Sequence, residues 1–370
     1  MSVTQKNPRP ALPPVRFRPA ADSAFRSELR QAAEQYLTSH SEHRFGNAGH
    51  YLKGILLALL AAAAYWLAVS AGQLWRFAPA YFAFLFLAML LAMNVLHDAA
   101  HYAYVRQPWL NRLLMRLVSI PVGIDPAFWT IRHVHFHHTY ANIEGYDLDT
   151  EPNPVLRQTP YQRWLPHFRL QHMYWPLVAA ISLPYLCWYS DWADRCGATK
   201  VAATGKRDGW PGWPLFLSLK ILHLTVAVLL PVWFLRDSGI GWGQVVLCYV
   251  LGQMLASCFL VAMILGTHWA EVDFFQPPAA GVMPHTWHEH TFRTACDWTP
   301  APRWLDHLMG GLNYHLTHHL FPTWSHRHYR SLASIVAQVA ARHQLNYRNL
   351  GYSQLWTSQQ AFLRAMGRKP

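Results

Sequence analysis

Histidine is unusually dense in one short stretch of the chain, residues 132–152. Four histidines fall within six residues there, at positions 133, 135, 137 and 138. If the stretch is helical, His133 and His137 lie one turn apart on one face, with His138 beside them. Neutral imidazole is the commonest side-chain ligand for transition metals, so such neighbours can hold one ion or two adjacent ions. The stretch therefore predicts a metal site.

Two further clusters of histidine and one single histidine have compatible spacing. An isolated pair of histidines one turn apart is more often a surface or packing feature, but three clusters, each at the end of an apolar segment, favour metal ligation. A tetrahedral structural zinc needs only four ligands. Eight or nine histidines therefore suit two metal ions, with open positions for a small molecule. These additional candidate ligands are His97, His101, His268, His315, His318 and His319.

The composition predicts an all-α integral membrane protein. Of the 370 residues, 52% are hydrophobic and only 14% are charged, whereas a soluble domain has about a quarter charged residues. The apolar residues form four long runs that predict membrane helices, and two shorter apolar stretches predict interfacial helices, with a full span over residues 174–189 as the alternative for the second. We thus expect about four transmembrane helices plus interfacial helices, with a histidine-rich cap that holds a di-metal site. The predicted spans are 54–72, 80–93, 215–235 and 245–265, and the predicted interfacial stretches are 110–129 and 174–189.

The regions outside the spans divide the chain into three parts. Residues 1–24 are basic and rich in proline, which is typical of a disordered tail. Residues 25–345 are expected to form one membrane domain, which begins with an amphipathic helix suited to the membrane surface and ends with another over 325–344. Residues 346–370 are expected to form a C-terminal tail. Five scattered cysteines indicate neither a disulfide framework nor a zinc knuckle.

Charge placement predicts the orientation in the membrane. The formal net charge is +12, and basic residues gather before the first and third spans. The two short loops on the other side offer only Arg76 and Arg236. By the positive-inside rule, both termini and all three histidine clusters face the cytosol. The basic balance accompanies membrane segments, so anionic lipid headgroups and acidic substrates are expected partners, and nucleic acid is not.

Three motifs resemble those of the membrane-bound, histidine-box fatty acid desaturases, in their linoleoyl-CoA-desaturase-like branch. The matching motifs are His-Asp-Ala-x-His, His-x-x-x-His-His-Thr-Tyr-x-Asn-Ile-x-Gly-x-Asp-x-Asp and Gly-Leu-Asn-x-His-x-x-His-His-Leu-Phe-Pro. The resemblance covers roughly residues 25–344. It implies a non-haem centre of two iron ions that uses O₂ and two electrons to introduce a carbon–carbon double bond into an acyl chain.

The resemblance also implies which side chains bind the metals. His268 matches an additional histidine that the family has after the fourth span. His135 falls where the family pattern varies and is left out. His315 stands where this branch usually has glutamine, and it still supplies a ring nitrogen. The implied ligands are His97, His101, His133, His137, His138, His268, His315, His318 and His319.

Polar residues near the boxes are candidates for fixing the orientation of the imidazole rings. For Asp147 and Asp149, helix capping or turn formation is an equally good interpretation. Lys220 and His223 lie within the third predicted span, where an ionisable side chain hints at function, although Lys220 is near enough to the cytosolic end to snorkel. The candidate supporting residues are Asp98, Asn142, Asp147, Asp149, His290 and Asn313.

The sequence has no His-Pro-Gly-Gly motif, so electrons are expected from an external donor such as a ferredoxin or small cytochrome. The expected substrate is a fatty acid, acyl thioester or acyl lipid. The same site could instead produce a hydroxylase, an acetylenase or an oxidative decarboxylase that forms a terminal alkene, because small shifts of the chain decide which hydrogen is lost. A histidine-rich metal transporter is the non-enzymatic alternative, but transporters place their ligands near the bilayer midplane. The double-bond position, acyl carrier and oligomeric state stay open.

Overall fold

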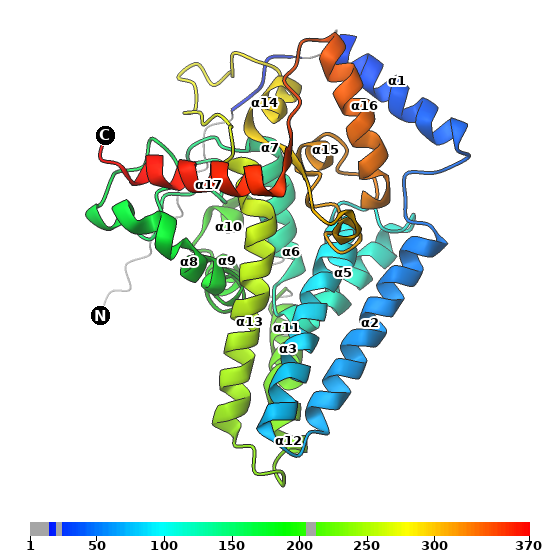
Figure 1. Ribbon diagram of the computed structural model, residues 1–370, viewed down its shortest axis with the longest axis vertical. Helices are drawn as coiled ribbons and strands as arrows, with labels where there is room; N and C mark the ends of the chain where they lie inside the picture. The colour runs from blue at the N-terminus through cyan, green and yellow to red at the C-terminus, as the bar shows by residue number, and fades with distance from the viewer. Residues whose placement is uncertain (1–14, 20–23, 205–211) are drawn as a thin grey trace.

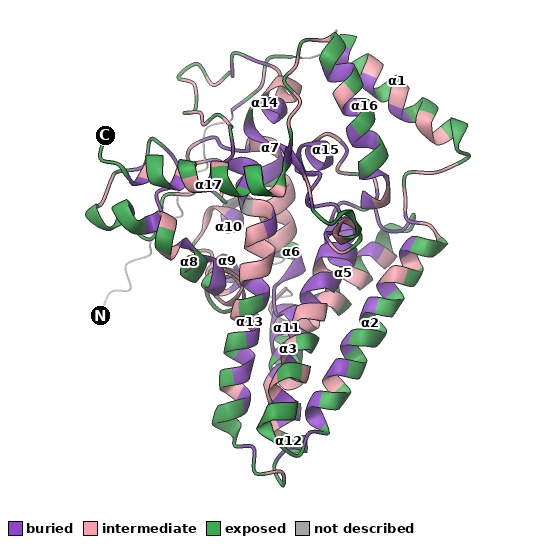
Figure 2. Cartoon of the chain, in the orientation of Figure 1, coloured by how far each residue is buried: buried purple, intermediate pink, exposed green. Residues whose placement is uncertain are grey.

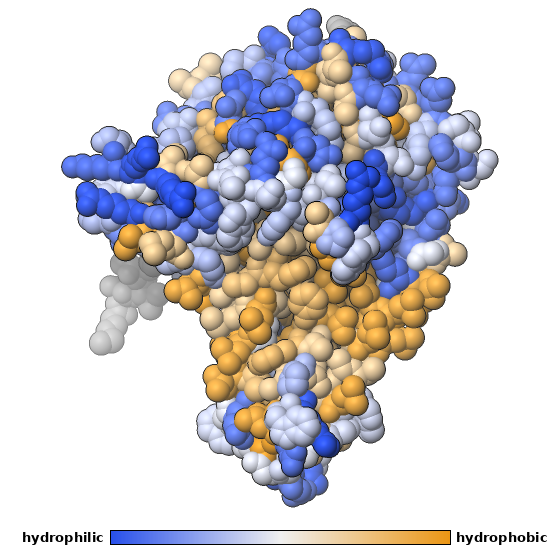
Figure 3. All heavy atoms as spheres, viewed as in Figure 1, coloured by the Kyte–Doolittle hydropathy of each residue, from blue (hydrophilic) through white to orange (hydrophobic). Residues whose placement is uncertain are grey.

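The computed structural model describes residues 15–19, 24–204 and 212–370. Nearly all of its regular structure is helical, as predicted. Long helices form a stem, and shorter helices gather in a cap at one end of it (Figure 1). Hydropathy follows the same division, because on the face seen in Figure 3 an apolar belt covers the stem between a polar cap and a small, mostly polar tip. This pattern is that of a protein embedded in a bilayer.

Four helical segments of the described residues are long and apolar enough to cross a membrane, and a bent pair, residues 108–122 and 126–140, gives a fifth if it is counted as one broken span. This agrees with the prediction of about four. Each of the four begins and ends within seven residues of its predicted position. The second and fourth continue directly into histidine-bearing turns at the cap. The spans are α2 (Ala48–Val69); α3 (Leu74–Leu91) with η1 (Ala92–Leu96) and α4 (His97–Ala100); α11 (Gly212–Leu224) with η5 (Thr225–Leu229) and α12 (Leu230–Phe234); and α13 (Trp242–Ile264) with η6 (Leu265–His268).

Buried and exposed residues alternate along α2 and α13 (Figure 2), whereas the part of the second span that leads to His97 is buried on all sides. On α2, Ala61, Ala64 and Ala68 are buried, whereas Leu59 and Leu67 are more than half exposed. Small residues allow α2 and α3 to pack closely, and α13 packs against α3 and α8. The exposed leucines belong to an apolar surface that suits contact with lipid.

A sharp corner interrupts the segment between the first two histidine clusters. Helix α5 (Pro108–Val122) is followed by α6 (Pro126–Thr130), η2 (Ile131–His137) and α7 (His138–Tyr140), and the two arms are bent by 111°. Gly123 ends α5 in the left-handed conformation, with φ of 91°. Asp125 then caps α6 by accepting hydrogen bonds from two backbone amides, and Pro126 occupies the first turn. The single interfacial helix predicted over 110–129 is therefore two helices that meet at a corner.

The segment after the second cluster runs through η3 (Pro166–Leu170), α8 (Gln171–Tyr185), η4 (Leu186–Ser190), α9 (Asp191–Arg195) and α10 (Lys200–Thr204). By length and composition, α8 is not among the spans found in the described residues. This agrees with the prediction of an interfacial helix. Its outward side carries Met173, Leu177 and Ile181, all exposed.

The cap consists mainly of short helices around the third histidine cluster. Helix α1 (Ala24–Ser39) packs on α16 (Tyr329–Arg342). Its buried side chains Phe25, Leu29 and Ala33 join the apolar cluster of the cap. This apolar face therefore packs inside the protein and does not lie on the membrane surface, which differs from the expectation from the sequence. The remaining cap elements are α14 (Trp287–Thr294), η7 (Arg303–His307), α15 (His315–Leu320) and η8 (His326–His328).

The C-terminal residues form β2 (Asn349–Gly351) and α17 (Tyr352–Gly367). Strand β2 pairs in parallel with β1 (Asp297–Thr299), and α17 packs on α8 and η3. Most of the predicted tail 1–24 lies outside the described residues, but Arg16 within it pairs with Val282. The three-part division of the chain stays a prediction.

Gly310 joins the loop before the third histidine cluster to the backbone before the first. Its φ is +59°, and a Cβ atom there would lie against the Met93 carbonyl, 2.6 Å from its carbon. Backbone cannot move aside as a flexible side chain can. The close approach therefore requires glycine.

We expect Gly310→Ala to separate these two segments and to destabilise the protein. The left-handed conformation alone costs about 1–2 kcal/mol for a residue with a Cβ atom, and the clash adds to this. Thermal unfolding in detergent measures the effect. Gly72→Ala is the control, since nothing lies within 4 Å of a Cβ atom there; equal stability of the two variants would contradict the prediction.

Candidate metal centre

Four separate segments bring the predicted histidine ligands together where the stem meets the cap. The end of the second span supplies His97 and His101, and the segment after the corner supplies His133, His137 and His138. The end of the fourth span supplies His268, and α15 supplies the third cluster. All nine rings are buried except that of His133, which is half-buried. Clusters distant in sequence therefore share one interior volume.

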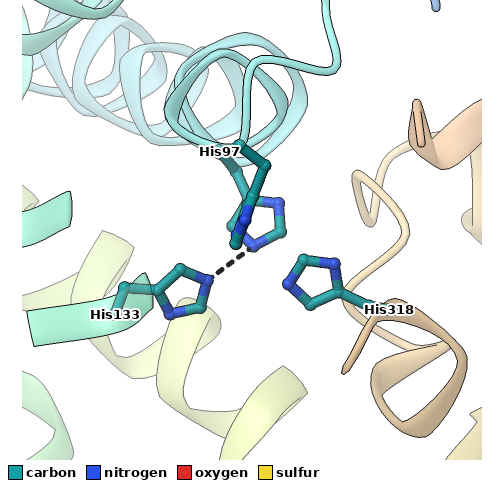
Figure 4. Close-up of side chains that lie close together, drawn as sticks. His97, His133 and His318 are labelled. Carbon is teal, nitrogen blue, oxygen red and sulfur yellow. Dashed lines mark hydrogen bonds between the residues drawn. The ribbon is translucent and has the colours of Figure 1, made fainter. Parts of the chain in front are cut away.

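The first group of histidines consists of His97, His101, His133 and His318. One ring nitrogen from each lies within 4.8 Å of the others. Figure 4 shows three of these rings, which come from three different segments and point toward one another. The Nε2 atoms of His97 and His133 are 3.1 Å apart. Two nitrogens bound to one metal ion at about 2.1 Å would have a similar separation.

The second group consists of His137, His268, His315 and His319, whose nitrogens also lie within 4.8 Å of one another. The ring centroids of His137 and His268 are 4.5 Å apart, and those of His268 and His315 are 4.6 Å apart. Both groups draw on η2 and on α15. These two elements therefore hold the groups side by side, as a centre with two metal ions requires.

His138 lies between the two groups. Its ring stacks on His319 at a centroid distance of 4.2 Å and also approaches His318 at 4.5 Å. Its Nε2 atom is 3.2 Å from that of His133. The ninth predicted ligand thus contacts members of both groups and belongs to neither four-histidine set.

The second cluster is arranged by a π-helix, which differs from the regular helix considered in the sequence analysis. In η2 the His138 amide donates to the carbonyl oxygen of His133, five residues earlier. The wider turn brings His133 and His138 together and places His133 and His137 in different groups. A second π-segment, η1, precedes His97. Such segments are frequent at functional sites because they re-aim side chains.

Several rings present an unshared nitrogen lone pair to the centre. His268 Nδ1 lies 2.7 Å from the carbonyl oxygen of Thr294, and a carbonyl only accepts, so the ring proton is on Nδ1. His137 Nδ1 faces the carboxylates of Asp147 and Asp149 at 3.3 and 3.2 Å, which favours the same tautomer. Among the described residues, the buried Nε2 atoms without a hydrogen-bond partner include those of His101, His268, His318 and His319. Buried nitrogens of this kind fit metal ligation.

Burial also keeps the third cluster uncharged. It lowers the pKa of His315, His318 and His319 well below the ordinary value, and the neighbouring rings lower it further. A neutral imidazole retains the lone pair that binds a metal. His137 differs, because the carboxylates of Asp149 and Asp147 raise its pKa to about 9, so a metal that binds there has to displace a proton. The neutral nitrogens of the third cluster fit a transition metal directly.

The predicted supporting residues take different positions. Asp147 and Asp149 contact His137, as described above. Asn142 donates to the carbonyl oxygens of His268 and Asp273, both at 3.1 Å. His290 and Asn313 bond to backbone carbonyls, Ala141 and Trp298 respectively. They support the loops around the centre rather than its rings.

Asp98 binds two histidines outside both groups. Its carboxylate lies 3.0 Å from His326 Nδ1 and 3.5 Å from His50 Nε2. Lys53 Nζ lies 2.8 Å from the other ring nitrogen of His326. These donors and acceptors form a chain from Lys53 through His326 to Asp98, which joins α2 and η8 to the first histidine cluster.

Two further residues support the third cluster: Tyr329, which was missed in the sequence, and Asp297, which lies in a segment that resembles the family pattern and was considered there as a possible support of the site or contact of the substrate headgroup. The Tyr329 hydroxyl lies 2.8 Å from His318 Nδ1. Asp297 accepts from the Thr317 amide at 3.1 Å and from the Tyr347 hydroxyl at 2.8 Å, which fixes the start of α15. No local signal marks Tyr329, which reaches His318 through tertiary packing.

Comparison with known proteins identifies the family. A family model described as fatty acid desaturase matches residues 73–351. The chain belongs to the fatty acid desaturase family. The sn-1 linoleoyl-lipid 6-desaturase of Synechocystis sp. is 30% identical over 345 residues, which cover 88% of this chain and 90% of that enzyme. The enzyme of the same name from Arthrospira platensis is 26% identical, with 87% of both chains covered. The acyl-lipid (8-3)-desaturase of Mortierella alpina is 24% identical over 76% of this chain and 63% of its own.

The desaturase is thus an integral membrane oxidoreductase, as the motifs predicted. Its two histidine groups are consistent with a metal site, and the family implies a di-iron centre. Membership of this family also removes the support for a metal transporter.

The lowered pKa values make the metal-free desaturase sensitive to acid. Burial lowers the pKa of His326 and His290 to about 3, in addition to the third cluster. Below pH of about 6.5 the unfolded chain binds protons that these folded rings do not, so each ring lowers the stability as the pH falls. His137, whose pKa the neighbouring carboxylates raise to about 9, acts in the opposite direction but is a single ring. We therefore expect the unfolding temperature of metal-free protein to decrease between about pH 7 and pH 5. A constant or rising unfolding temperature would contradict this, and His135→Ala, at an exposed histidine, should leave the slope unchanged.

Proposed function

We propose that the desaturase binds two iron ions, one in each four-histidine group, with His138 between them. The observation that carries this proposal is the pair of adjacent, buried groups with inward-facing nitrogens. The bound iron would supply the activation of O₂ and the removal of two hydrogens from an unactivated acyl chain. Each double bond formed would consume one O₂, two electrons and two protons and release two waters.

The protein contributes orientation and exclusion of water. Thr294 holds the His268 ring through its carbonyl, Asp147 and Asp149 hold His137, and Tyr329 holds His318. Rings fixed in this way lose little freedom when a metal binds. The buried position keeps bulk water away from a reactive centre.

The proposed substrate is an acyl chain esterified in a membrane lipid. The two most extensively matched relatives described above act on linoleoyl-lipid, according to their names. An apolar chain in the bilayer would reach the junction of stem and cap without crossing water. We further propose that the cap and both termini face the cytosol, where a ferredoxin or small cytochrome would supply electrons.

A product analysis tests the proposed reaction. The protein would be expressed with a ferredoxin system, and the fatty acids of each lipid class would be analysed by mass spectrometry, including the headspace. We expect a fatty acid lighter by two hydrogens that appears first in glycerolipids. A hydroxy acid, or an alkene one carbon shorter, would instead show that the same centre performs another oxidation; product formed first on acyl-CoA would overturn the lipid substrate.

The role of His138 separates ligation from packing. We expect His138→Ala to insert normally but to lose iron and at least about 99% of activity, because the ring contacts both groups. Iron content per protein and product formation are the measurements. His135→Ala is the matched control in the same segment, because His135 is exposed and should retain both ions. A fully active His138→Ala variant would contradict the assignment of His138 as a metal ligand.

A further inference from the structure

The corner between α5 and α6 exposes backbone carbonyls to the interior of the stem. A helix leaves its last carbonyl groups without partners, and within a membrane domain no water can satisfy them. Side chains from other helices do so here. His223 Nδ1 donates to the Ile120 carbonyl at 2.8 Å, and Gln253 Nε2 donates to that of Val122 at 3.2 Å.

Lys220 donates a hydrogen bond to the backbone of the corner itself, at Gly123. It lies in the third span, roughly 12 Å along the helix from Gly212, and its side chain is buried. Its ammonium group donates to the carbonyl oxygens of Gly123 at 2.6 Å and Cys187 at 2.7 Å, and to the carboxylate of Asp191 at 2.7 Å. All three of its N–H donors are therefore used. A cation beside the end of a helix also complements the partial negative charge there.

Asp191 extends the same network to the start of α6. The carboxylate that pairs with Lys220 also accepts from the Asp125 backbone amide at 2.7 Å. One turn later on α9, the buried Asp194 binds Arg132 through two hydrogen bonds of 2.9 and 2.6 Å. Both ends of the segment that leads to His133 are thus attached to α9.

The corner has no room for adjustment. A Cβ atom on Gly123 would lie 2.6 Å from both Cys187 Sγ and His223 Nε2. Helix α6 has only five residues and continues without a break into η2. Any rotation at the corner would therefore be carried to the histidines of η2.

We propose that Lys220, His223, Gln253 and Asp191 are positioning residues of the metal centre: they fix the α5–α6 corner, and the corner determines where η2 presents His133 and His137. The ionisable residues of the third span therefore serve the site through the backbone, although none of them contacts its rings. This inference rests on the proposed function for its activity readout, but not for its metal-binding readout.

The test compares single and paired substitutions. Lys220→Met leaves the Asp191 charge buried and unpaired, whereas Lys220→Met with Asp191→Leu removes both charges, which often preserves folding. Cobalt(II) replaces iron as a probe, because its visible absorption reports the geometry of its ligands without any reaction. Product formation by the iron-loaded protein is measured in parallel. Tyr65→Phe is the matched control, since it removes a hydrogen bond to Val226 in the same stem, away from the corner.

If the network positions η2, the paired variant inserts and folds, but its cobalt spectrum changes and product formation falls about tenfold to a hundredfold. A paired variant with the wild-type spectrum and rate would overturn the inference, since the charges would then serve folding alone. If the paired variant does not fold, the Gln253→Met variant tests the inference instead, because it removes only the hydrogen bond to the Val122 carbonyl. An unchanged cobalt spectrum of this variant would overturn the inference, and an altered spectrum would support it. Wild-type protein that binds cobalt but forms no product would count against the proposed function and leave this comparison intact.

Discussion

Nine histidine rings share one buried volume at the junction of stem and cap, largely out of reach of water. A buried nitrogen without a partner is costly, and several of these rings leave one unpaired in the described structure. The surrounding fold must therefore hold the rings against this cost until a metal binds. The short connections between spans and boxes, the π-segments and the hydrogen bonds to individual rings all serve this constraint.

The same constraint explains why polar groups occur where a membrane protein would otherwise avoid them. The corner before the second cluster has a bent backbone inside the stem, and Lys220 and His223 satisfy its carbonyls. Lys53, His326 and Asp98 form a second polar chain beside the first cluster. Charged side chains in a bilayer are costly, and here each lies where the backbone of a histidine-bearing segment needs a partner or an anchor.

The sequence predicted the spans well because long apolar runs are a local pattern, and the histidines that it singled out as ligands are brought together by the fold. Long apolar runs define the four membrane helices, and His97 and His101, one helical turn apart in sequence, lie in the same histidine group of the structure. The π-helix was not predictable in the same way, because the residues before His138 fit a regular helical turn and a widened one equally well. The partition of His133 and His137 between two groups followed from that turn. The contacts of Tyr329 with His318 and of Lys220 with Gly123 join different elements, 11 and 97 positions apart in the chain, so no periodicity reveals them.

Anomalous scattering at the iron edge, from crystals of the iron-loaded protein, tests the central claim most directly. The account predicts two peaks, one surrounded by His97, His101, His133 and His318 and the other by His137, His268, His315 and His319. A single peak, or a peak among His50, Asp98 and His326, would contradict it.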